Sequence, residues 1–94
     1  VIWVDAKVMD TGKQYAGVTP VSALKGLAEG VLAVTKEAYD GKFSSKEYVG
    51  KLSNKGVGFV ITPAWAKKIP ASLQNEVKDL AANIAAGSID VNNA

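Results

Sequence analysis

Two stretches with the apolar spacing of an amphipathic helix constrain the fold of this chain more than any other feature. Apolar side chains recur three and four residues apart over residues 21–40 and again over residues 70–86, which is the spacing of a helix with one apolar face. Thr19 as N-cap and Pro20 at the first helical position predict the start of the first helix. Each pattern stops at a glycine, which favours helix termination: Gly41 and Gly87.

Short β-prone runs surround the two predicted helices. Residues 1–4 are apolar and end at Asp5, and a polar loop over residues 6–17 follows them. A Ser-Asn-Lys-Gly turn separates two further runs, and one more run follows the second helix; these three runs cover residues 46–51, 57–62 and 89–91. We therefore predict an α/β fold in the order strand, helix, strand, strand, helix, strand, built from residues 1–94 as a single segment.

Composition excludes several classes of function. The eleven basic residues are all lysines and are spread along the chain, with a net charge of +2; this favours a solvated surface over a nucleic-acid interface, which uses clustered Arg and Lys. The chain has no Cys and no His, which excludes disulfides, thiolate nucleophiles, Ser-His-Asp triads and most zinc sites. No acidic residues have the spacing of a calcium loop. We expect no catalytic residues, no metal site and no cofactor, and hence no enzyme.

Two charged residues are candidates for ligand binding. Asp5 follows the first predicted strand, and ligands of open α/β sheets bind beyond the carboxyl ends of strands. Lys25 falls early in the first predicted helix, where the helix dipole disfavours a cation. The alternatives are that Asp5 caps a loop or pairs with Lys7, and that Lys25 is a solvated residue paired with Glu29.

Glycines and aromatic residues give weaker signals. Gly26 and Gly30 lie inside the first predicted helix, where each costs about 1 kcal/mol relative to Ala, so we expect a neighbouring group to pack closely against them. Tyr15 and Trp65 fall in predicted loops and could line a cleft or cover the edge of the core. Trp3 and Phe59, in predicted strands, favour core positions.

Taken in order, these segments resemble the basic membrane protein family of substrate-binding lipoproteins. The resemblance covers the strand ending in Val-Asp, the Thr-Pro-Val-Ser-Ala-Leu-Lys segment, the Gly-Lys-Phe turn, the Gly-Val-Gly-Phe strand and the final Ile-Ala-Ala-Gly-Ser-Ile-Asp-Val. The segments that carry it are residues 1–5, 18–25, 38–43, 48–52, 56–59, 69–70 and 84–91.

The resemblance implies the C-terminal part of a type I periplasmic-binding-protein fold, in which two lobes close on a ligand. It implies an extracytoplasmic protein, lipid-anchored or periplasmic, that binds a purine nucleoside for an ABC transporter permease. By the resemblance, Asp5 and Lys25 contact the ribose hydroxyls, the chain crosses between lobes near residues 18–22, and a missing N-terminal part supplies most of the base pocket. Two alternatives remain: a non-transport regulator of the same fold, and a free-standing small α/β interaction domain.

Overall fold

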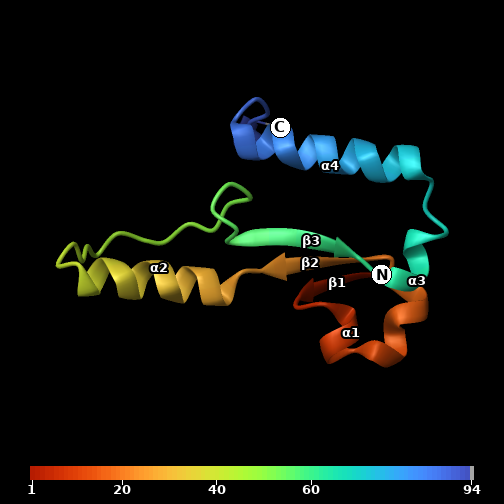
Figure 1. Ribbon diagram of the computed structural model, residues 1–94, viewed down its shortest axis with the longest axis horizontal. Coiled ribbons are helices and arrows are strands. Elements are labelled where there is room, and N and C mark those ends of the chain that lie inside the picture. Colours follow the sequence, from red (N-terminus) through yellow and green to blue (C-terminus); the bar gives the residue numbers. More distant parts are fainter. Residues whose placement is uncertain (94) are drawn as a thin grey trace.

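A three-stranded mixed sheet organises the computed structural model, which describes residues 1–93 (Figure 1). Its strands are β1 (Ile2–Asp5), β2 (Val21–Lys25) and β3 (Val57–Ile61), in the order β1-β2-β3. β1 and β2 are parallel, whereas β2 and β3 are antiparallel. The predicted α/β class is therefore confirmed at the level of a mixed sheet with helices.

The helices lie between and after the strands. α4 begins and ends where the sequence predicts a second helix, and Gly87 ends it in the left-handed conformation at φ 85°, which glycine adopts without steric cost. The helices are α1 (Val8–Thr11), η1 (Lys13–Val18), α2 (Leu27–Tyr39), α3 (Pro63–Ala66), α4 (Ala71–Ala86) and η2 (Val91–Asn93), where η marks 3₁₀ geometry.

The predicted start of the first helix is wrong. Residues 21–25 form the central strand β2, and the helix begins only at Leu27. The helical spacing of apolar residues continues across Gly26, but β1 and β3 supply hydrogen bonds along both edges of this segment, and such pairing overrides a local helical pattern. Lys25 is therefore the last residue of a strand, and Thr19 is the C-cap of η1 rather than an N-cap.

Two predicted strands are absent from the described residues, so the predicted element order is also wrong. Residues 46–51 form a loop that returns from α2. There the Asn54 side chain accepts hydrogen bonds from the N–H groups of Lys51 and Gly56 and donates to the carbonyl of Val49, replacing a partner strand. Residues 89–91 do not form a strand either, because the N–H groups of Ser88 and Ile89 turn back to cap α4 at a carbonyl of its last turn.

Buried hydrogen bonds hold the elements around the sheet together. The N–H group of Val8 in α1 donates to the Ser22 hydroxyl in β2 at 3.0 Å, and all these atoms are buried. The Thr62 hydroxyl donates to the carbonyl of Thr19, joining the end of β3 to the segment before β2. We call β1, β2, β3, α1, η1 and α3 together the sheet unit (residues 1–25 and 57–66).

The rest of the chain extends from this unit. Figure 1 shows α2 projecting beyond the end of β2, with residues 40–50 returning alongside it; we call residues 27–50 the arm. The radius of gyration is 15.9 Å, against about 12 Å for a compact domain of this length. No helix within residues 1–93 is both long and apolar enough to cross a membrane. The described chain therefore has an open shape with little core of its own.

Candidate ligand-binding cleft

The two predicted ligand-binding residues lie next to each other at one edge of the sheet. Asp5 ends β1 and lies opposite Leu24 in the register of the two strands. Lys25 follows Leu24 and ends β2. Lys25 Nζ lies 3.1 Å from Asp5 Oδ1, and the two side chains are 59% and 62% exposed respectively. The structure thus pairs Asp5 with Lys25, rather than Asp5 with Lys7 or Lys25 with Glu29.

Backbone strain accompanies this pair. Asp5 has φ 75° and Lys55 has φ 61°, and they are the two non-glycine residues with positive φ among residues 1–93. Residues other than glycine adopt this region at an energetic cost, which is smaller for Asp than for Lys, and such residues gather at functional sites. Because both line the same cleft, the strain points to this edge of the sheet.

The cleft beside the pair has a volume of about 620 Å³, within the range of small-molecule sites. Leu24 and Phe59 supply apolar surface, and Lys55 reaches it from the turn before β3. Its charged lining comprises three acids and three lysines: Asp5, Asp10, Glu29, Lys7, Lys25 and Lys55. This lining provides acceptors and donors for a polar, uncharged ligand such as a sugar. No group of three acidic residues within residues 1–93 could hold a metal ion.

A tight contact fixes the position of Lys25 at the cleft. The N–H group of the next residue, Gly26, donates to the carbonyl of Gly56 at 2.9 Å. A Cβ at Gly26 would overlap the carbonyl oxygen of Lys55, and one at Gly30 would lie 3.1 Å from the ring of Tyr48. The expected close packing at both glycines is confirmed, so the turn before β3 sets where the chain leaves β2.

The two aromatic candidates lie away from this cleft. Tyr15 stacks on Trp3, with ring centroids 5.8 Å apart, and Trp65 donates its indole N–H to the carbonyl of Ala16 at 3.2 Å. Neither is among the residues that line the cleft. Both cover the loop between β1 and β2, which corresponds to the alternative of covering the edge of a core. Trp3 and Phe59 themselves are only half-buried.

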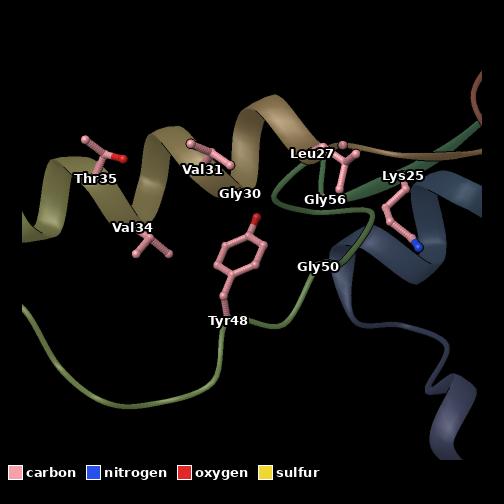
Figure 2. Close-up of a pocket in the computed structure, with 10 residues that line it drawn as sticks. Lys25, Leu27, Gly30, Val31, Val34, Thr35, Tyr48, Gly50 and Gly56 are labelled. Atoms are coloured by element: carbon pink, nitrogen blue, oxygen red, sulfur yellow. The ribbon is translucent and has the colours of Figure 1, made fainter.

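A second hollow lies between α2 and the returning segment (Figure 2). Its volume is about 510 Å³. In Figure 2 the ring of Tyr48 points toward α2 at Gly30, and Val34 lies beside it. The lining from α2 is almost entirely apolar: Leu27, Gly30, Val31, Val34 and Thr35. This hollow has the character of a packing groove rather than a polar binding site.

Sequence reasoning missed the contributions of Lys55 and Glu29 to the cleft. Turn chemistry identified the Ser-Asn-Lys-Gly turn, but its position beside Lys25 follows from the antiparallel pairing of β3 with β2. Glu29 enters because α2 begins directly after the strand that carries Lys25. No local signal in the sequence marks either residue.

Comparisons with known proteins give no further information about the function of this chain. Neither a family model, nor a curated protein, nor a solved structure matches the chain. The described chain is a small mixed α/β unit with a polar cleft at the end of its parallel strand pair.

Proposed function

We propose that this chain is the sugar-binding part of an extracytoplasmic solute-binding protein, which delivers purine nucleosides to an ABC-type importer. The observation that carries the proposal is the 3.1 Å approach of Lys25 Nζ to Asp5 Oδ1 at the carboxyl ends of two adjacent parallel strands. A carboxylate accepts hydrogen bonds from two vicinal hydroxyls, and an ammonium group donates to their oxygens. The position at the strand ends is the usual one for ligands of open α/β sheets.

In this proposal the chain is the C-terminal part of a two-lobed type I periplasmic-binding-protein fold. A missing N-terminal part of the same protein supplies most of the base pocket, and closure of the lobes on the nucleoside prepares docking to the permease. The lobe crossing expected near residues 18–22 depended on a helix there, whereas β2 continues the sheet. A crossing after Lys25 fits better, because the chain leaves the sheet at Gly26 and returns at Gly56.

The same proposal says where the protein is located and how it acts. The protein is periplasmic or a membrane-anchored lipoprotein, and it acts by binding, without catalysis or a cofactor. Its partners are the nucleoside and the permease rather than nucleic acid. The exposed Asp5–Lys25 pair favours this mode, since two solvated charges can exchange their mutual contact for hydrogen bonds to a neutral sugar at small cost.

Nuclear magnetic resonance titration of the ¹⁵N-labelled chain tests the sugar site. Guanosine and free ribose, added at millimolar concentrations, should shift the amide signals of residues 5–7 and 24–26. Weak binding is expected because base stacking comes from the other lobe. The Asp5→Asn variant should lose these shifts, since an amide accepts hydrogen bonds less strongly than a carboxylate.

The matched control is Asp79→Asn, which removes the same charge from α4, away from the cleft. It should titrate like the unmodified chain. Equal shifts with Asp5→Asn would contradict the role of Asp5, and shifts with adenine base alone would contradict sugar recognition. No response to either ligand at millimolar concentration would contradict the nucleoside site.

The open shape favours a second candidate, a small α/β interaction domain. Apolar residues on the sheet and on both long helices are exposed, and soluble domains rarely leave contiguous apolar patches uncovered unless another surface binds them. This candidate needs no ligand in the cleft. It predicts instead that the described apolar faces bind another protein surface.

A further inference from the structure

One face of the sheet is apolar and stays unburied in the described chain, although Val57 at its end lines a hollow with Ile84 and Ile89 from the end of α4 and the segment after it. Cross-strand partners lie on the same face of a sheet, so the register defines the set opposite to buried Ser22: Ile2, Val4, Val21, Ala23, Val57, Phe59 and Ile61. We call this set the open face. None of its members is buried, and Ile2 and Val4 are 64% and 63% exposed. The face carries no charge except Lys25 at its end.

Helix α2 carries a complementary apolar surface that the sheet of the same chain does not use. Leu27, Val31 and Val34 lie on one side of the helix by their spacing. Tyr48 of the returning segment lines a hollow with them, but Leu27 and Val31 remain 66% and 67% exposed. A helix that follows a strand in an α/β unit normally packs back on the sheet. Here α2 continues away from the end of β2 (Figure 1), which is the arrangement of an element exchanged between copies.

The chain leaves more surface exposed than one partner contributes to a standard interface. The accessible surface is 7172 Å², about 2,000 Å² more than the roughly 5,200 Å² of a compact folded chain of this size. A standard interface removes about 800 Å² from each partner. This excess is summed over the whole chain, including the exposed apolar residues of α4, and the open face and α2 contribute part of it.

We propose that two copies of this chain form a dimer in which α2 of each copy covers the open face of the other. The proposal is argued from these apolar surfaces and not from the function proposed for the cleft, but Val57 and Phe59 belong to both the open face and the cleft. A partner helix on the open face would therefore also contact the cleft. The dimensions agree: thirteen residues of α2 give a helix about 20 Å long. The strands of four and five residues are about 15 Å long, and the outer two lie about 10 Å apart. Each copy provides both a helix and a face, so a two-fold arrangement closes without leaving either surface free.

Light scattering after size-exclusion chromatography measures the mass directly. The unmodified chain should elute with twice the mass of one chain at micromolar concentration. Val31→Asp should raise the dimer dissociation constant at least about 100-fold, because a buried unpaired carboxylate costs that much. Lys36→Asp places the same residue on the opposite side of α2 and should leave the dimer intact. A monomeric unmodified chain, or equal loss in both variants, overturns the proposal.

Cross-linking tests the arrangement without a destabilising charge. The chain has no cysteine, so Val31→Cys and Val4→Cys each carry a single thiol. Mixing the two variants, one labelled with ¹⁵N, and adding a short bis-maleimide should give a heterodimer identified by mass. Val4→Cys mixed with Lys36→Cys should give far less. Equal yields from both mixtures overturn the exchange, and a folded monomer would indicate that another part of a longer polypeptide covers the open face.

Discussion

The sheet unit and the arm differ in how their polar and apolar groups are satisfied. In the sheet unit, Thr19, Ser22 and Thr62 are buried. Ser22 accepts a hydrogen bond from α1, the Thr62 hydroxyl donates to the carbonyl of Thr19, and the Thr19 hydroxyl donates to the carbonyl of Tyr15 in η1. In the arm no side chain is buried. The Asn54 side chain donates a hydrogen bond to the carbonyl of Val49 at the end of the arm, and Gly26, just before the arm, donates to the carbonyl of Gly56. Polar groups therefore fix the sheet unit internally, whereas the arm needs an external surface to bury its apolar residues.

Because of this difference, we expect the two regions to differ in their resistance to local opening. Interlocking hydrogen bonds between buried groups are costly to break singly, so the sheet unit should resist local opening. The arm has few buried contacts, and regions of that kind open at low free energy. Substitutions should therefore change the free energy of unfolding more in the sheet unit than in the arm. Equal changes in both regions would contradict this difference between them.

The largest effect is expected at Gly12 in the sheet unit. A Cβ there would overlap the indole ring of Trp3, whose N–H group is held by the Thr11 hydroxyl at 2.8 Å. Gly12→Ala should lower the free energy of unfolding by about 2–3 kcal/mol, since overpacking forces a ring and a backbone apart. Urea titration followed by tryptophan fluorescence measures it, because both tryptophans lie in this unit.

Gly17→Ala provides the matched control, since a Cβ at Gly17 meets nothing within 4 Å. It should change the free energy of unfolding by less than about 0.5 kcal/mol. Similar losses in both variants would mean that the packing of Trp3 does not stabilise this unit, and the contrast with the arm would lose its basis.

Local patterns predicted the parts of the fold that depend on local interactions. The extent of α4 follows from its apolar spacing and from Gly87, and β1 and β3 follow from short β-branched runs. β2 could not be predicted, because its spacing also fits a helix and only its neighbours β1 and β3 select the strand. The loop at residues 46–51 has strand composition, but the Asn54 side chain supplies its hydrogen bonds locally.

Only the Asp5–Lys25 pair of the candidate cleft could be predicted from the sequence. Asp5 follows from the end of β1. Lys25 was selected for a helical position that it does not occupy, and its proximity to Asp5 results from the parallel register of β1 and β2. Lys55 enters through a contact about thirty residues away in sequence, which no local pattern encodes.

A smaller effect is expected in the arm, at Gly30. Alanine is favoured over glycine inside a helix by about 1 kcal/mol, and the neighbour is the ring of Tyr48, an exposed side chain that can move. Gly30→Ala should therefore stabilise α2 locally by at most about 0.5–1 kcal/mol. Hydrogen exchange should slow at α2 amides and remain unchanged in β2. Slower exchange in both regions would show that the arm and the sheet unit open together.

The smallest effect on stability is expected at the cleft. Lys25→Met keeps the aliphatic stem and removes the charge that pairs with Asp5. Because both side chains are more than half exposed, the pair contributes less than about 0.5 kcal/mol, and urea titration should barely distinguish the variant. Lys78→Met on α4 is the matched control. The ribose-induced amide shifts should nevertheless disappear in Lys25→Met alone.

A loss of stability above about 1 kcal/mol would exceed what an exposed pair supplies and would make the pair a structural contact of the sheet unit. Unchanged stability with lost shifts would instead separate binding from folding at this edge of the sheet.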